Sequence, residues 1–177
     1  RLNAWFGNFV SAHRKGETDS EWYDWYSWFG PDESSGGLAT QQITGSSDYY
    51  ECNFSGDMPE LNFDNDAVRQ AVLDIAAYYL DLGVDGFRFD AAKYIYLGDD
   101  AASERFWFWY IHRLKALKPD IYTIAEVWSS DTVTNIYYRS LNCFNFTTSQ
   151  ASGLIAETAK KGNVNTFTSY VDNYITK

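Results

Sequence analysis

The chain has 177 residues, and 14 Lys and Arg against 24 Asp and Glu give it a formal net charge of −10 at pH 7. An acidic chain with scattered basic residues lacks the surface that neutralises phosphates, so neither a nucleic acid nor an anionic membrane is an expected partner. Hydrophobic residues at 45% and aromatic residues at 19% exclude a disordered chain and predict a globular fold with a sizeable core. No run of about 18 apolar residues occurs, so no membrane span is expected.

The two cysteines, Cys52 and Cys143, lie far apart and show no zinc or redox spacing. A single disulfide and two unrelated buried thiols are both compatible with this arrangement. We expect two unrelated thiols, because free cysteines are usually buried as small hydrophobic residues.

Residues 1–62 are rich in aromatic residues, Gly, Ser and Asp and show little periodicity, which predicts a long loop or a small irregular subdomain. An aromatic cluster over residues 22–28 (Trp22, Tyr23, Trp25, Tyr26 and Trp28) has two interpretations. The rings can stack on sugar rings, or they can pack on the core, and core packing is the expected role.

Residues 63–177 alternate between helical and strand patterns. The periodicity predicts helices at about 66–82, 102–118 and 152–161, and strands at 84–90, 121–128 and 143–146. A short or irregular helix is expected before the third strand. Such alternation indicates right-handed βαβ units around a parallel sheet, although the chain is shorter than the roughly 250 residues of a closed (β/α)₈ barrel.

Two of the predicted strands end on a carboxylate, Asp90 in the first and Glu126 in the second. At the carboxyl ends of neighbouring parallel strands, two such groups can come within the roughly 5–5.5 Å that a retaining glycosidase needs. Arg88 lies two residues before Asp90, so both side chains project from the same face of the strand. The alternative is that the carboxylates are solvated strand ends, helix N-caps or simple ion-pair partners of Arg88.

Three short motifs carry a resemblance to a known family. Residues 86–93 (GFRFDAAK) resemble the strand-4 motif of the α-amylase family of retaining glycoside hydrolases, and residues 124–128 (IAEVW) resemble its strand-5 motif. Residues 58–62 (MPELN) are similar to the motif near the end of the loop domain that follows strand 3. All three stand in the order of the family, so the combination is far more specific than any one of them.

The resemblance implies a role for each matching residue. Asp90 matches the nucleophile, Glu126 the general acid/base, and Arg88 the arginine that holds the nucleophile. Lys93 matches a position that contacts substrate, and Tyr94 stands where the family often has a histidine. Tyr94 is therefore expected to contact substrate in a different way.

The resemblance also implies the fold and a metal. The expected fold is α/β: a partial (β/α)₈ TIM barrel, about strands 4 to 6, over residues 63–177, preceded by the loop subdomain over residues 1–62. Where family members bind calcium, an acidic residue of the short motif supplies an oxygen, and Glu60 stands there. The strand-3 and strand-7 motifs have no counterpart here, because His13 and His112 lie in other contexts.

The expected function is therefore hydrolysis of α-glucosidic bonds, mainly α-1,4, in starch-like glucans or maltooligosaccharides with retention of configuration. The alternative is a family relative that has lost catalysis and serves as a carbohydrate-binding or transporter-accessory subunit. An enzyme acting on starch usually has to be exported, because the polymer is too large to cross a membrane. We therefore expect an extracellular enzyme, with a cytoplasmic maltodextrin enzyme as the alternative.

Overall fold

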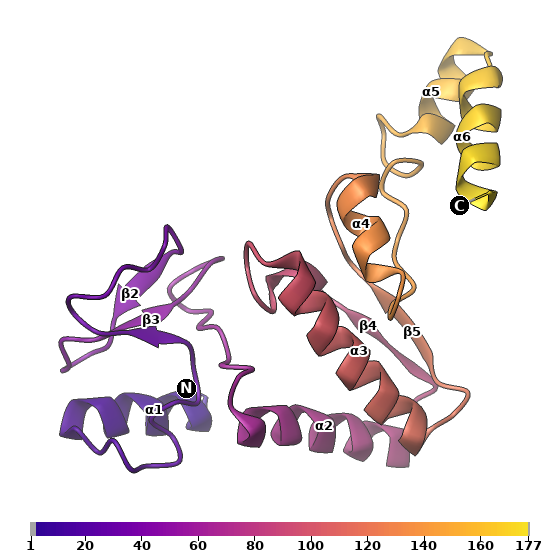
Figure 1. Ribbon diagram of the computed structural model, residues 1–177. Helices are drawn as coiled ribbons and strands as arrows, with labels where there is room; N and C mark the ends of the chain where they lie inside the picture. Colours follow the sequence, from indigo (N-terminus) through magenta and orange to yellow (C-terminus); the bar gives the residue numbers. More distant parts are fainter. Residues whose placement is uncertain (1–2, 177) are drawn as a thin grey trace. The chain divides into compact units, whose positions relative to one another are not determined.

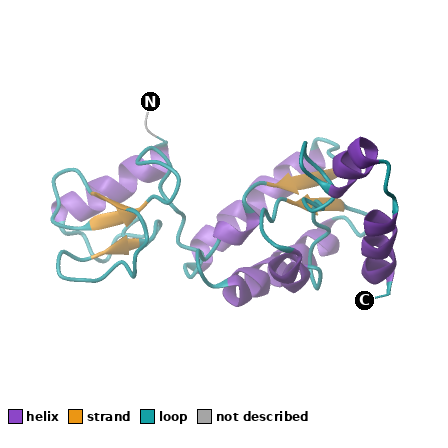
Figure 2. Cartoon of the chain, turned by 90° about the horizontal axis from the view of Figure 1, so that it is seen from above, coloured by secondary structure: helices purple, strands orange, loops and turns teal. Residues whose placement is uncertain are grey.

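The computed structural model describes residues 3–176 and divides the chain into two compact units, one ending at Gly83 and the other beginning at Val84. The N-terminal unit contains α1 (Ala4–Lys15), β1 (Trp28–Phe29), β2 (Thr40–Gln42), β3 (Tyr49–Glu51) and α2 (Asp66–Asp81) (Figure 1). The C-terminal unit contains β4 (Gly86–Phe89), the 3-10 helix η1 (Ala92–Tyr94), α3 (Asp100–Leu117), β5 (Tyr122–Ala125), α4 (Asp131–Tyr137), α5 (Leu154–Lys161) and α6 (Asn165–Ile175). Each unit has its own small sheet, as Figure 2 shows.

The N-terminal unit is more regular than its sequence pattern predicts. Its three strands form an antiparallel sheet in the order β1-β3-β2, with Tyr50 of β3 opposite both Trp28 and Gln41. The periodic face of α1 carries Phe9, which is fully buried. This helix begins at the cap formed by Asn3, whose side chain accepts a hydrogen bond from the Trp5 N–H at 2.9 Å. Residues 3–62 therefore form a subdomain with a helix and a sheet, which is more regular than the long loop or small irregular subdomain expected there.

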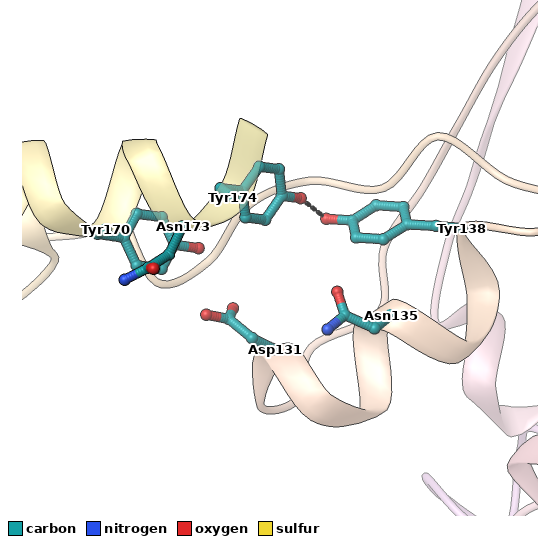
Figure 3. A pocket seen from close by; sticks show the side chains of 6 residues that line it. All are labelled: Asp131, Asn135, Tyr138, Tyr170, Asn173 and Tyr174. Atoms are coloured by element: carbon teal, nitrogen blue, oxygen red, sulfur yellow. Dashed lines mark hydrogen bonds between the residues drawn. The ribbon is translucent and has the colours of Figure 1, made fainter. Parts of the chain in front are cut away.

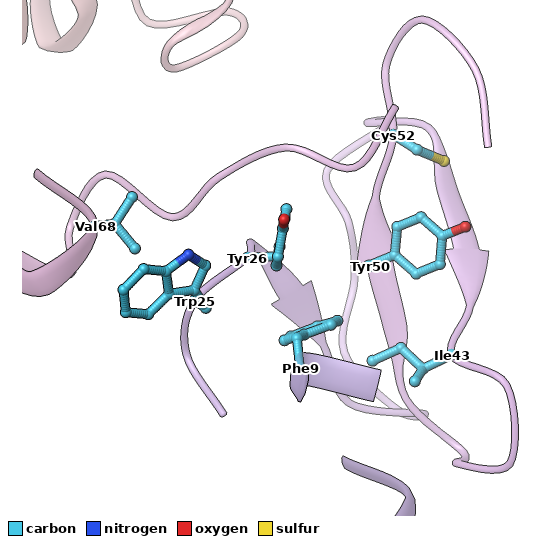
Figure 4. Packing of buried hydrophobic residues seen from close by; sticks show 7 residues of the cluster. All are labelled: Phe9, Trp25, Tyr26, Ile43, Tyr50, Cys52 and Val68. Atoms are coloured by element: carbon cyan, nitrogen blue, oxygen red, sulfur yellow. The ribbon is translucent and has the colours of Figure 1, made fainter. Parts of the chain in front are cut away.

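Aromatic side chains make most of the core of this unit. The buried cluster consists of Phe9, Trp25, Tyr26, Ile43, Tyr50, Cys52 and Val68 (Figure 4). Trp22 and Trp28 pack against it. The cluster at residues 22–28 thus packs on the core, which confirms that interpretation over sugar stacking.

The sheet of the C-terminal unit is built on two parallel strands. Strands β4 and β5 pair from Gly86 opposite Tyr122 to Phe89 opposite Ala125. Gly86 is required there, because a Cβ at this position would lie only 1.9 Å from the carbonyl oxygen of Tyr122. Helix α3 covers the pair through Trp107, whose ring centroid lies 4.6 Å from that of Phe89.

The predicted third strand at 143–146 is wrong in extent. It is reduced to one parallel bridge between Ala125 and Cys143, with hydrogen bonds from Ala125 N–H to the Asn142 carbonyl at 2.7 Å and from Phe144 N–H to the Ala125 carbonyl at 3.1 Å. Asn145 ends the pairing, because its side chain accepts the N–H of Thr148 at 3.0 Å and closes a turn.

The helices predicted at 66–82, 102–118 and 152–161 are confirmed as α2, α3 and α5, with no end shifted by more than two residues. Their starts follow capping chemistry: Asn65 accepts the Ala67 N–H at 2.9 Å, and Asp99 accepts the Ala102 N–H at 2.8 Å. Cys52 and Cys143 are both free thiols, as expected. Over residues 3–176, no helix has the length and apolar character needed to cross a membrane.

Candidate active site

The two strand-end carboxylates lie side by side in the C-terminal unit. Asp90 directly follows β4 and Glu126 directly follows β5, and the last paired residues of these strands are Phe89 and Ala125. The ladder continues one step further, because the Glu126 N–H donates to the Phe89 carbonyl at 2.8 Å. Both carboxylates therefore leave the same edge of the sheet at the same level, as the sequence predicts.

Arg88 joins the two carboxylates. Its Nη1 donates to Oδ1 of Asp90 at 2.8 Å, and its Nη2 donates to Oε2 of Glu126. The guanidinium also lies over the ring of Phe144, 5.9 Å from the centroid. The side chain of Glu126 is 24% exposed and that of Asp90 is 76% exposed, so the two carboxylates stand in different environments.

The turn that follows Asp90 is fixed from two sides. Ala91 adopts a left-handed conformation with φ 46°, which is unusual for a residue with a side chain. The next residue, Ala92, is fully buried, and its N–H donates to the Glu126 carbonyl at 2.9 Å. Its own carbonyl accepts the indole N–H of Trp107 at 2.7 Å. The backbone beside one carboxylate is thus hydrogen-bonded directly to the backbone beside the other.

Lys93 and Tyr94, the predicted substrate contacts, follow on η1. The Lys93 ammonium lies 5.5 Å from the centroid of the Tyr94 ring, which is a cation–π distance. Both residues are partly exposed, and the carbonyl of Lys93 accepts the buried hydroxyl of Ser103 at 3.4 Å. They therefore belong to the same fixed turn as Asp90.

An aromatic pair beyond Glu126 was not predicted. The rings of Trp128 and Phe146 stack at 5.5 Å with planes 8° apart, and Trp128 is 63% exposed. They line a shallow pocket of about 280 Å³ together with the hydroxyl and amide groups of Ser149 and Gln150. Trp128 stands two residues after Glu126, but its partner comes from a distant segment, so local spacing gives no signal for the pair.

Glu60, the predicted calcium ligand, lies in the N-terminal unit. Its Oε1 accepts the Asn53 N–H at 3.3 Å, while Glu51 Oε1 accepts the Asn53 amide at 2.6 Å. The pKa of Glu60 is raised, mainly because the carboxyl group is buried. The hydrogen bond from the Asn53 N–H lowers this pKa, and the charge of Glu51 raises it further. Asn53 Oδ1 is buried and has no hydrogen-bond partner in the described structure. Residues 3–176 contain no cluster of three or more His, Cys, Asp or Glu side chains suited to a metal.

Comparison with known proteins gives a consistent family. Residues 2–173 match the family model of the α-amylase catalytic domain. Alpha-amylase 3 of Dictyoglomus thermophilum is 39% identical over 144 residues, which cover 80% of this chain and 27% of that protein. The 4-alpha-glucanotransferase of Thermotoga maritima is 34% identical over 104 residues, covering 57% of this chain and 22% of that protein.

A solved structure shares the fold as well. Amy13B of Eubacterium rectale superposes with a TM-score of 0.79 at 28% identity, over 89% of this chain and 31% of that one. The chain thus spans about a quarter to a third of the proteins it matches.

Proposed function

The chain belongs to the α-amylase family, and on that premise we propose that it carries the central catalytic residues of a retaining glycoside hydrolase. The substrates are starch-like glucans or maltooligosaccharides, cleaved mainly at α-1,4 bonds. In this proposal β4, β5 and the segment at Cys143 are strands 4, 5 and 6 of a (β/α)₈ barrel. Their parallel order in space supports that assignment.

The observation that carries the proposal is the contact of one guanidinium with two carboxylates at the ends of adjacent parallel strands. In the first step, Asp90 attacks the anomeric carbon and Glu126 protonates the leaving glycosidic oxygen, so the C–O bond breaks and a glycosyl ester forms. In the second step, Glu126 takes a proton from water, which displaces Asp90 and restores both groups.

Arg88 has the same function in both steps. Its guanidinium donates to the carboxylate of Asp90 and holds it in a fixed direction. Glu126 exchanges its contact with Arg88 for the glycosidic oxygen when substrate binds. Lys93 and Tyr94 contact the sugar from the turn after Asp90, and the exposed face of Trp128 offers an apolar platform beside Glu126.

The assignment of roles is tested in the intact protein with Asp90→Asn and Glu126→Gln. Each variant should lower the rate of reducing-sugar release from soluble starch by several orders of magnitude. Asp85→Asn is the matched control, because the side chain of Asp85 is 96% exposed and Asp85 directly precedes the same strand. Near-normal activity in either site variant would show that the assignment is wrong.

The alternative function is a non-catalytic family relative that binds carbohydrate. Retention of both Asp90 and Glu126 in contact with Arg88 favours the enzyme. Saccharide binding by the intact protein without release of reducing sugar would favour the binding subunit instead.

We further propose that Glu60 helps to hold calcium. An oxygen-only donor set is available around Asn53, because its buried Oδ1 lacks a partner and the carboxylates of Glu60 and Glu51 both contact the same residue. Calcium chloride should raise the thermal unfolding midpoint of the intact protein relative to EDTA. Glu60→Gln should abolish most of that increase, whereas the exposed control Glu17→Gln should keep it.

Export is the proposed location, since a polymeric substrate lies outside the cell. Fractionation of the source culture should place the protein in the medium. Recovery from the cytoplasm, with preference for short maltodextrins over starch, would support the cytoplasmic alternative.

A further inference from the structure

A second pocket lies between α4 and α6 in the C-terminal unit (Figure 3). It has a volume of about 730 Å³, within the range of pockets that hold small molecules. Its lining is Asp131, Asn135, Tyr138, Tyr170, Asn173 and Tyr174. None of these residues belongs to the site around Asp90 and Glu126.

The lining comes from two helix faces with unusual composition. Asp131, Asn135 and Tyr138 follow at intervals of four and three residues, so they share one face of α4 and its C-terminal end. The residues contributed by α6 have the same kind of spacing, at 170, 173 and 174. These two faces are mostly exposed and present rings and amides in place of aliphatic residues.

Several of these side chains are already held in place. Tyr170 accepts the Asn145 amide at 2.9 Å, and its ring stacks on that of Tyr174 at 5.7 Å. Asp131 accepts the hydroxyl of Thr147 at 2.6 Å, and the hydroxyls of Tyr138 and Tyr174 are hydrogen-bonded to each other. A ligand would therefore meet walls that are ordered before it binds, which lowers the entropic cost of binding.

Two amides in the pocket are available to a ligand. Asn135 and Asn173 are exposed, and within residues 3–176 no hydrogen bond engages their side chains. Each amide can donate and accept, so the pair can bind hydroxyl groups that do both. Figure 3 shows the two amides on opposite sides of the pocket, one from each helix.

The charge of the lining narrows the ligand class. No Lys, Arg or His is among the described residues that line the pocket, and Asp131 brings a carboxylate. Phosphorylated and carboxylated ligands are therefore disfavoured. Tyrosine rings can pack against the C–H faces of a sugar, and the amides can bind its hydroxyl groups, so the lining fits a neutral saccharide.

We propose that the α4–α6 pocket is a second saccharide-binding site, which holds a glucosyl segment of the same α-glucan away from the cleavage site. The identity of the sugar rests on the proposed function. The chemistry of the pocket itself requires only a neutral polyhydroxylated ligand. A polymer held there would be kept near the strand-end carboxylates of the same unit, which raises its effective concentration at the cleavage site.

The test uses the intact protein with Glu126→Gln, so that the probe is not consumed. Titration calorimetry with maltoheptaose should detect two sites in this background and one site after Asn135→Ala and Asn173→Ala are added. Tyr174→Ala, which removes an exposed ring, should weaken the same site at least about threefold. Asn8→Ala, an exposed amide on α1, is the matched control and should keep both sites.

The catalytically intact protein supplies the second measurement. The paired Asn variant should lower kcat/KM on amylopectin while leaving kcat/KM on maltotriose unchanged, because a long polymer can occupy both sites at once, whereas the maltotriose that is cleaved fills the cleavage site alone. Two sites that persist in the paired variant would overturn the proposal. Saturable binding of glycine betaine without maltoheptaose binding would also overturn it, because the tyrosine rings and Asp131 would then form a cation-binding site.

The two proposals fail in different ways. If maltoheptaose binding depends on Asn135 and Asn173 but no glucan is hydrolysed, the pocket proposal is supported and the proposed enzyme function is wrong. If glucans are hydrolysed and only one binding site exists, the enzyme stands and the pocket proposal falls.

Discussion

Arg88 is the residue on which the geometry of the candidate site depends most. Two carboxylates at the ends of adjacent strands repel each other, and a guanidinium between them offsets this repulsion. Its planar group of donors reaches Asp90 with one nitrogen and Glu126 with another. A lysine ammonium is a single point charge and cannot hold both carboxylates in fixed directions.

We therefore predict that Arg88→Lys in the intact protein lowers kcat/KM on maltooligosaccharides by roughly a hundredfold, although the charge is kept. Steady-state kinetics measures the change. Arg113→Lys, an exposed position on α3, should leave the kinetics unaltered. Activity close to that of the unmodified protein in Arg88→Lys would show that charge alone is sufficient.

Glu60 gives a prediction about pH. Its folded-state pKa lies above the ordinary value of 4.5, chiefly because of burial. The folded state therefore binds the proton of Glu60 more tightly than the unfolded state does. The contribution of protonated Glu60 to the stability of the fold is fully present below about pH 4.5 and is lost as pH rises through the raised pKa. With EDTA present, Glu60→Gln should raise the unfolding midpoint more at pH 7 than at pH 4. An equal effect at both pH values would contradict this reasoning.

At the scale of elements, α3 positions the turn that carries Asp90. Trp107 donates to the buried carbonyl of Ala92, and Ser103, one helical turn earlier, accepts the Tyr96 N–H at 3.1 Å. Both side chains lie on the buried face of α3. Helix α3 thus packs on the sheet through aromatic rings and also uses two polar groups to fix the turn that follows Asp90.

Trp107→Phe removes the donor and keeps most of the ring. The carbonyl of Ala92 is then buried without a partner, which costs about 1–3 kcal/mol of unfolding free energy. We expect kcat to fall at least about tenfold, because the turn that carries Asp90 moves, and KM to rise as well, because Lys93 and Tyr94 lie on the same turn. Phe108→Leu, a neighbour on α3 that is 59% exposed, is the control. A change in KM alone would contradict a positioning role.

The sequence predicts the elements whose signals are local. Helices α2, α3 and α5 each combine apolar residues at helical spacing with residues that cap or end a helix. The GFRFD run places Arg88 and Asp90 on the same face of a strand. α1 and α6 are missed, since their aromatic, β-branched and polar residues lower helix propensity and tertiary packing decides their structure. The contact of Arg88 with Glu126 and the stacking of Trp128 on Phe146 join distant segments, so spacing along the chain does not reveal them.

At the scale of the whole molecule, the strand-end carboxylate of Asp90 is open to solvent. Asp90 is 76% exposed, and the matched relatives are about three times as long as this chain. We predict that a protein of these 177 residues alone releases no reducing sugar from starch above background, because a pocket wall is needed to orient substrate and exclude water. Turnover by this chain alone would show that the missing wall is supplied in another way, for example by a second copy.

The backbone bonds at Ala92 also determine which part of the site can move. The amide of Ala92 lies in a turn, where amides usually exchange with solvent quickly, yet it is fully buried and bonded to the Glu126 carbonyl. It should therefore exchange its proton as slowly as the amides of the strands. Asp90, the proposed nucleophile, then stands on a rigid support. Under the proposed function, adjustment to different sugars is then expected on the side of Trp128, whose indole is exposed.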